Sequence, residues 1–392
     1  MVNLIKRFLD ENQGIFFLLK NIMRELSLYF VGYLIYSNVL CKSVDFCWFW
    51  EKFMVKVVVD VFGGDHSPEE IIKGCKMALD DNQDLSIVMV GDSDIINSKI
   101  DENSIDKSRV EIIDAKEVIS NDETPTVAIR SKANSTIVKG FEALRQREDV
   151  AGFVSAGSTG AVLTGAFLKL GRIKGVSRPA LCPILPTVNG GCVGLVDCGA
   201  NMDCKPINLV HFALMGVAYL KDVMGIENPR VALLSVGVED HKGNELTKEV
   251  FGMLKVMEDI NFVGNMEARE LLSGEYDLVV CDGFAGNVLL KSTEGAVVSV
   301  LRMMKQSIKS HLSSKIGACF MKKTFKELKN TLDFNTKGGS VLLGCKKIVV
   351  KCHGASKAFS IKCGIEQVIE AYNAKVCEKI ENAVSKLENN CE

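Results

Sequence analysis

The sequence predicts an α/β fold in which a largely parallel sheet carries helices on both faces. Two observations support this class. After residue 54, short runs rich in valine, leucine and isoleucine alternate with amphipathic stretches of helical spacing. The short runs are apolar at nearly every position, which is typical of parallel strands that are buried on both faces. With 392 residues, of which 47% are hydrophobic and 24% charged, the chain can also form a large core.

Each element follows from its local pattern. The expected strands, in chain order, cover residues 55–61, 85–90, 110–113, 150–155, 181–185, 192–197, 231–236 and 278–281. Helical spacing of apolar residues is clearest over residues 68–79, 136–147, 209–223 and 248–257. No internal repeat or low-complexity linker interrupts this pattern, so we expect residues 54–392 to form one compact α/β unit, with one lobe or two.

Composition argues against several classes of function. The net charge is −2 at pH 7, so no global field favours nucleic acid. The 14 cysteines form no CxxC pair, and the five histidines, at positions 66, 211, 241, 311 and 353, form no HExxH motif. We therefore expect no metal and no cofactor, and we interpret the cysteines as small core residues of a protein in a reducing cytosol.

Residues 1–53 differ from the rest of the chain. They hold many of the aromatic residues, including Trp48 and Trp50. Their uncharged run, residues 26–41, is shorter than the ~20 residues that a membrane-spanning helix needs. Two interpretations remain: an extension that contacts a membrane, or translated upstream sequence. We favour the second, because Met54 directly opens the first strand and its glycine turn, "MVKVVVDVFGGDHSPEE".

Five glycine-rich segments follow expected strands, at residues 63–66, 155–160, 197–201, 237–244 and 282–287. In open parallel sheets, ligands bind beyond the carboxyl ends of the strands. The segment SAGSTG at 155–160 also enters a helix, so its backbone N–H groups could bind an anion. It matches neither GxxxxGKS/T nor GxGxxG nor GxSxG, which favours a small anion such as phosphate. A tight structural turn is the alternative.

Two polar residues stand at strand-to-helix junctions. Lys242 follows the strand "VALLSV", and its compact charge suits phosphate or a developing oxyanion. Asn287 lies in "CDGFAGN", where its amide suits an oxyanion hole. A surface lysine and a helix cap are the structural alternatives.

Residues 302–330 form a basic segment, with eight lysines and arginines against one acid, Glu327. Apolar residues recur at helical spacing among the basic ones. The segment is therefore expected to be helical, with either a solvated basic face or a surface for anionic lipid or an acidic protein.

Several of these motifs together resemble the bacterial phosphate acyltransferases of phospholipid synthesis (the PlsX family). The resemblance runs from Val57 to about Val368 and includes "VSAGSTGAV", "LVDCGAN", "NPRVALLSVGVEDHKGNELTKE", "EYDLVVCDGFAGNVLLKSTEG" and "KCHGAS". It implies a three-layer α/β/α fold like that of phosphotransacetylases and isopropylmalate dehydrogenases, and a homodimer. It also implies that residues 54–392 transfer an acyl group from an acyl carrier protein to inorganic phosphate. The acyl phosphate would feed a membrane glycerol-3-phosphate acyltransferase. The protein itself would be cytoplasmic and could contact the membrane peripherally.

The resemblance implies a role for each group of candidate residues. Phosphate is itself the nucleophile, so no serine or cysteine nucleophile is required. We assign carbonyl polarisation to Asn287 and phosphate binding to Lys242, which could also share the first role. The further candidates are the phosphate loop with Ser155, Gly157, Ser158, Thr159 and Gly160, the substrate-binding or supporting residues Asn201, Asp282, Gly283 and Gly286, and the first-loop residues Asp60, Gly63, Gly64 and Asp65.

The chain departs from the family pattern in two places. Ser158 replaces the usual asparagine, which should change phosphate geometry while keeping a donor. The usual Tyr-Gly-Gly-Ala-Pro reads Lys-Gly-Gly-Ser-Val at 337–341, which affects contacts of the acyl pocket or the dimer. The alternative functions are a phosphotransacetylase acting on acyl-CoA and a non-catalytic phosphate-binding protein of the same fold.

The interpretation of residues 1–53 predicts that the native protein begins at Met54. Mass spectrometry of the protein isolated from its own cells should yield an N-terminal peptide starting there. Detection of any peptide from residues 1–53 would contradict it.

Overall fold

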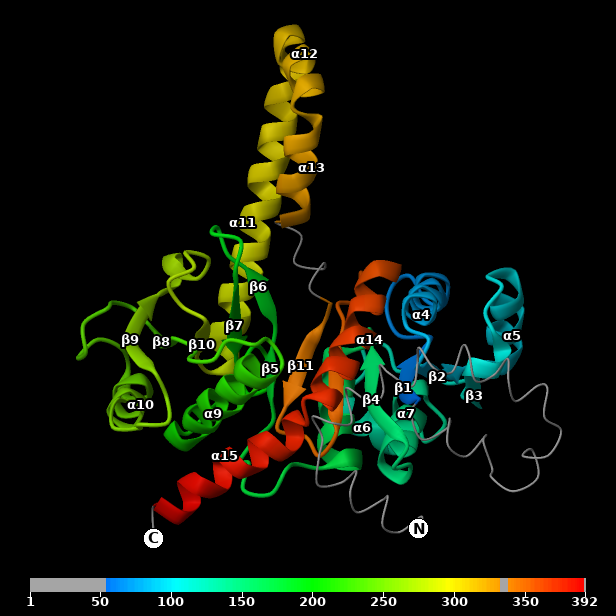
Figure 1. The fold of residues 1–392 in the computed structure, drawn as a ribbon, viewed down its shortest axis with the longest axis horizontal. Coiled ribbons are helices and arrows are strands. Elements are labelled where there is room, and N and C mark those ends of the chain that lie inside the picture. Colours follow the sequence, from blue (N-terminus) through cyan, green and yellow to red (C-terminus); the bar gives the residue numbers. More distant parts are fainter. Residues whose placement is uncertain (1–53, 332–337, 391–392) are drawn as a thin grey trace, which may run out of the picture. The chain divides into compact units, whose positions relative to one another are not determined.

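The computed structural model describes residues 54–331 and 338–390. The expectations for residues 1–53 and for Lys337 lie outside this part. Within it, two sheets form the framework (Figure 1).

The larger sheet has seven strands in the order β3-β2-β1-β4-β12-β11-β5. Its strands β1 to β4 and β12 are mutually parallel, and β11 runs antiparallel to both β12 and β5. The strands are β1 (Val55–Asp60), β2 (Leu85–Gly91), β3 (Val110–Asp114), β4 (Val150–Ser155), β5 (Ala180–Cys182), β11 (Ser340–Leu343) and β12 (Ile348–Lys351).

The smaller sheet has five strands in the order β6-β7-β10-β8-β9, and only β6 is antiparallel to its neighbour. These strands are β6 (Ile184–Pro186), β7 (Cys192–Val196), β8 (Val231–Ser235), β9 (Phe262–Glu267) and β10 (Leu278–Val280). Both sheets are thus largely parallel, as the sequence predicts.

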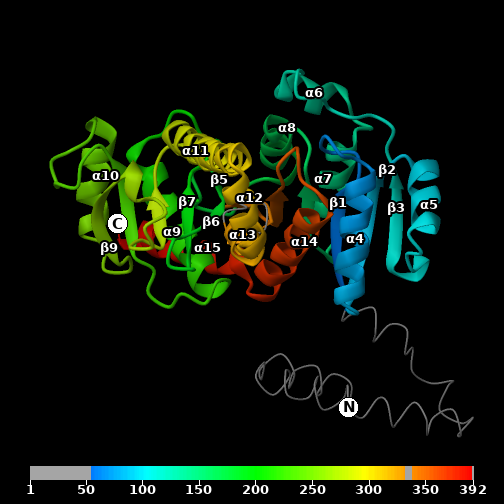
Figure 2. The same cartoon turned by 90° about the horizontal axis from the view of Figure 1, so that it is seen from above.

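Helices cover both faces of the two sheets (Figure 2). One face carries α4 (Glu69–Asp81), α5 (Ser93–Glu102), α9 (Pro206–Asp222), α10 (Glu245–Lys255), α14 (Ala358–Asn373) and α15 (Val376–Asn390). The other carries α6 (Pro125–Ser131), α7 (Thr136–Gln146), α8 (Thr159–Gly165), its continuation η2 (Ala166–Leu170), and the start of α11 (Gly283–Ser310). Short 3₁₀ turns are η1 (Lys107–Arg109) and η3 (Ala268–Glu270).

Alternation along the strands divides the interior into two apolar layers. In β1, Val57 and Val59 belong to one layer and Val58 to the other; in β10, Leu278 and Val280 are separated from Val279 in the same way. Each layer extends across both sheets. Because successive side chains of a strand point to opposite faces, the sheets act as the middle of a three-layer α/β/α fold.

The prediction of one continuous strand over residues 181–185 is wrong. Pro183 divides it into β5, which belongs to the larger sheet, and β6, which belongs to the smaller one. Proline has no N–H to donate to a strand ladder, so it marks the point at which the chain changes sheets. The sequence prediction also lacked β9, β11 and β12.

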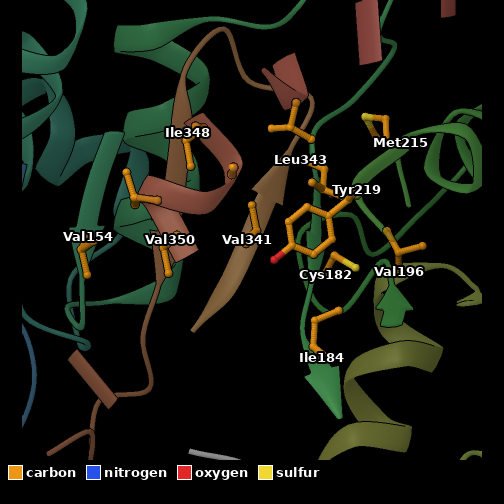
Figure 3. Packing of buried hydrophobic residues seen from close by; sticks show 14 of the residues in the cluster. Val154, Cys182, Ile184, Val196, Met215, Tyr219, Val341, Leu343, Ile348 and Val350 are labelled. Atoms are coloured by element: carbon orange, nitrogen blue, oxygen red, sulfur yellow. The ribbon is translucent and has the colours of Figure 1, made fainter. Parts of the chain in front are cut away.

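The junction between the sheets is closed by Tyr219 of α9, which is 1% exposed. Figure 3 shows its ring near Cys182 of β5, with Ile184 of β6 and Val341 of β11 around it. Burial of a large aromatic side chain at this place removes apolar surface of both sheets from water.

The basic segment is helical in the structure. It comprises the end of α11, α12 (Leu312–Phe320) and α13 (Lys322–Thr331), and Figure 1 shows α12 and α13 beside the outer part of α11. Among the described residues, no helix is both long and apolar enough to cross a membrane.

Candidate active site

The first candidate group lies at the carboxyl ends of β1 and β4. The Asp60 carboxylate, 1% exposed, accepts the Ser155 hydroxyl at 2.7 Å and the Phe62 N–H at 3.2 Å. Ser155 Oγ in turn accepts the Gly157 N–H at 3.0 Å. Burial raises the pKa of Asp60, and the hydrogen bond from Ser155 opposes that shift. The first loop and the 155–160 loop are therefore built on one buried carboxylate.

Two of the first-loop glycines are required by close packing. A Cβ on Gly63 would lie 2.6 Å from both Asp60 Oδ2 and the Gly157 nitrogen. Gly64 has a φ of +93°, and its Cβ would lie 2.8 Å from the Gly354 oxygen. Asp65 donates its N–H to the same oxygen at 2.8 Å. A cavity of about 300 Å³ lies beside this loop, lined in part by Gly63, Gly157 and Ser158.

The two ends of the 155–160 loop have different surroundings. The Ser155 hydroxyl faces the interior and is engaged by Asp60, so it supports the loop. Ser158 precedes α8, Thr159 begins it, and Gly160 packs against Pro125 of α6. The first N–H groups of a helix have no partner within the helix. The N–H groups from Ser158 onward are thus the ones available to an anion.

Sequence reasoning assigned no role to Lys351, which ends β12 opposite Ser155 in the sheet register. This lysine is 7% exposed, and burial lowers its pKa to about 8, while the charge of Asp60 opposes that shift. Its ammonium donates to the Cys352 carbonyl. The "KCHGAS" motif was a signal for this residue, but its strand was not predicted.

The second candidate group lies at the carboxyl ends of β7 and β10 in the smaller sheet. Asp197 is fully buried and accepts four N–H groups: Leu181 N at 2.9 Å, Ala200 N at 3.3 Å, and Asn201 N and Nδ2 at 2.6 and 2.9 Å. Burial raises the pKa of Asp197 to about 6, and these hydrogen bonds limit the rise. Asn201 also donates to the Pro179 carbonyl at 2.8 Å.

The start of α11 packs directly on this group. Asp282 caps the helix by accepting the Ala285 N–H at 2.9 Å, and Gly283 donates its N–H to the Asn201 carbonyl at 2.8 Å. A Cβ on Gly286 would lie 2.0 Å from the backbone carbonyl oxygen of Asp197. Asn287 follows one residue later, with its amide carbon 3.6 Å from the Cβ position of Gly199. The structure thus brings together Asn201, Asp282, Gly283, Gly286 and Asn287.

Lys242 lies on the loop between β8 and α10. Its side chain passes 3.1 Å from the Cβ position of Gly237, and its Nζ forms no hydrogen bond or ion pair with a described residue. Since β8 pairs with β10 in parallel, Lys242 and Asn287 follow neighbouring strands at the same edge. The 155–160 loop follows β4 of the larger sheet, so the candidate residues form two groups.

Three thiols surround the second group. Burial raises the pKa of Cys198 to about 12 and that of Cys204 to about 11, and it also raises the pKa of Cys281. Such thiols are poor nucleophiles, because the thiolate is the reactive form. In residues 54–331 and 338–390, no group of three His, Cys, Asp or Glu side chains is placed to hold a metal ion.

Solved structures with this fold define the class. A phosphotransacetylase from Streptococcus pyogenes superimposes with a TM-score of 0.51 at 15% identity, covering 87% of this chain and 98% of that one. A branched-chain phosphotransacylase from Enterococcus faecalis V583 gives 0.52 at 15% identity, covering 81% and 99%. The chain therefore has the α/β fold of the phosphotransacetylases, and the predicted fold class is confirmed.

The sequence comparisons then identify the family. The model of the family described as "Fatty acid synthesis protein" matches residues 55–379. A putative phosphate acyltransferase from Clostridium perfringens (strain 13 / Type A) is 44% identical over 332 residues, 85% of this chain and 97% of the relative. The phosphate acyltransferase from Clostridium novyi (strain NT) is 43% identical over 332 residues, 85% and 99%. The chain belongs to this family of phosphate acyltransferases, and the predicted resemblance and enzyme class are confirmed.

The buried carboxylate of Asp197 makes a prediction about stability. Asp197→Ala should lower the free energy of unfolding by at least ~3 kcal/mol, because the N–H groups of Leu181, Ala200 and Asn201 would lose a charged acceptor in the interior. Urea unfolding of purified protein measures this change. The matched control is Asp282→Ala, which removes a helix cap and should cost ~1 kcal/mol. Equal midpoints for the two variants would contradict the prediction.

Proposed function

We propose that this protein transfers a long-chain fatty acyl group from an acyl carrier protein to inorganic phosphate. The product would be an acyl phosphate for phospholipid synthesis. Membership of the phosphate acyltransferase family supports the reaction type. One observation carries the mechanism. The strand edges present backbone N–H donors, the Asn287 amide and the Lys242 ammonium, whereas burial raises the pKa of the nearby Cys198 and Cys204 thiols.

This set of groups favours direct attack by phosphate. A phosphate oxygen would add to the thioester carbonyl carbon and form a tetrahedral intermediate with a negative oxygen. Breaking the C–S bond would then release acyl phosphate and the carrier thiolate, which takes up a proton. The N–H groups from Ser158 to Gly160 and Lys242 would orient phosphate, and the Asn287 amide would stabilise the oxyanion. Asn201 and Asp282 would hold the start of α11 in place.

The proposed roles predict a large loss of turnover without a loss of fold. Lys242→Ala and Asn287→Ala should each lower kcat by ~10²–10³-fold, the usual effect of removing one donor to a developing oxyanion. Acyl phosphate trapped with hydroxylamine measures kcat, with phosphate and palmitoyl carrier protein as substrates. Lys248→Ala, an exposed lysine in the first turn of α10, is the control. Near-normal turnover in either test variant would disprove its assigned role.

An acetyl-CoA enzyme is the second candidate, because the matched structures are described as a phosphotransacetylase and a branched-chain phosphotransacylase. The same hydroxylamine assay separates the two candidates when palmitoyl carrier protein, palmitoyl-CoA and acetyl-CoA are supplied in parallel. A non-catalytic phosphate-binding protein would give no product with any of them.

We further propose that the helices of the basic segment contact the acidic carrier protein or an anionic membrane surface. Arg302, Lys305 and Lys309 are exposed on the outer part of α11. Large apolar side chains are exposed beside them, including Met303 at 68% and Phe320 of α12 at 87%. Exposed basic and apolar side chains on the same helices are typical of a surface that binds an acidic or amphipathic partner. We also propose that the protein forms a homodimer and that its product is used by a membrane glycerol-3-phosphate acyltransferase.

Charge reversal tests this surface. The double substitution Lys305→Glu and Lys309→Glu should weaken binding to phosphatidylglycerol-containing vesicles or raise KM for the carrier protein by at least ~5-fold, because each reversed charge repels an anionic partner. Lys116→Glu, at an exposed loop position, is the control. If both quantities equal those of the control, the basic face has no role in docking.

A further inference from the structure

A second cavity, of about 320 Å³, lies between α6 and the helical segment α8–η2, and among the candidate site residues Asn201 alone lines it. Figure 2 shows α6 and α8 next to each other on one side of the sheets. Leu163, Phe167 and Leu168 form one wall, and the buried Leu342 of β11 also lines the space. Arg130 is the one charged residue among those that line it.

The wall formed by α8–η2 is an apolar surface left open to solvent. Leu163 and Phe167 are four residues apart and therefore lie on one face of the helix. Phe167 is 52% exposed and Leu168 41% exposed, although both are large apolar side chains. An exposed apolar surface of this kind, continuous with a cavity, is typical of a binding site for an apolar ligand.

One end of the cavity touches the candidate active site. Asn201 lines the cavity, and its carbonyl accepts the Gly283 N–H at the start of α11, four residues before Asn287. The same helix that bears Leu163 and Phe167 begins at Thr159, directly after Ser158 of the proposed phosphate loop. A ligand in this cavity would thus contact Asn201 of the second candidate group and the helix that begins at the proposed phosphate loop of the first.

We propose that this cavity binds the acyl chain of the thioester substrate and that Leu163 and Phe167 determine chain-length preference. The inference rests on the proposed acyl transfer. The lining includes the polar residues Thr126, Arg130, Thr164 and Asn201, but Leu163, Phe167 and Leu168 of the α8–η2 wall offer no hydrogen bond, and an acyl chain needs none. The pantetheine arm of the carrier has amide groups, whose burial against such a wall would cost free energy. The volume is at the lower end of the ~300–1,000 Å³ of ligand pockets, so the exposed Phe167 and Leu168 would cover the outer part of a long chain.

Chain-length kinetics test the assignment. Burial of each further methylene should raise kcat/KM by ~4-fold until the cavity is full. Leu163→Trp, which fills the cavity, should lower kcat/KM for palmitoyl carrier protein by at least ~10-fold and that for hexanoyl carrier protein by less than ~2-fold. Phe167→Ala, which removes part of the wall, should lower the palmitoyl value by ~3–10-fold. Acyl hydroxamate formation by the full-length protein measures kcat/KM for each donor in each variant.

The matched control is Val263→Trp, a substitution of an apolar residue that is 45% exposed on β9 in the smaller sheet. It should leave the palmitoyl-to-hexanoyl ratio unchanged. The same ratio in all variants, or equal losses for both donors in Leu163→Trp, would overturn the assignment; equal losses would place the pantetheine arm there instead. Absence of product from wild-type protein with every donor would refute the proposed function itself, which is a separate outcome.

Discussion

The carboxylate of Asp197 is the interaction on which the arrangement of the two sheets depends. Asp197 follows β7 of the smaller sheet, yet it accepts the N–H of Leu181 in β5 of the larger sheet at 2.9 Å. It also accepts two N–H groups of Asn201, whose side chain donates to the Pro179 carbonyl before β5. A buried charge without such donors costs several kcal/mol, so the position of β5 relative to β7 is set by the need to satisfy this carboxylate.

The polar groups proposed for catalysis take their positions from this constraint. Gly283 and Gly286 let α11 approach the Asp197 loop so closely that a side chain at either position would collide with it, and this approach places Asn287 beside Gly199. Asp60 has a comparable function in the larger sheet, where it holds Ser155 and the first loop. Each edge is thus organised by a carboxylate that is itself withdrawn from solvent, which leaves N–H and amide groups to face a ligand.

Much of this organisation was readable from the residues. The alternation of apolar runs and helical spacing predicted most strands, and glycine beside a polar residue marked each loop that now lies at a strand edge. Three strands were not predicted, for physical reasons. β9 carries the polar residues Asn265 and Glu267 and a Gly264 with a φ of +103°, and β11 and β12 are short strands separated by Gly344. The apolar runs of β11 and β12 are only three residues long. Although these two strands pair with each other, their other partners, β5 and β4, lie far away in the chain.

Local pattern was sufficient for the α/β class and for the glycine-rich loops at the strand edges, because periodicity and turn chemistry depend on neighbouring residues. The family followed from the resemblance of several motifs. Other features appeared only in three dimensions. They include the change of sheet at Pro183, the inward direction of the Ser155 hydroxyl and the cavity between α6 and α8–η2. All of these depend on contacts between distant segments: Ser155 bonds to Asp60, 95 positions earlier, and no spacing within a single segment encodes which remote donor will satisfy a buried carboxylate.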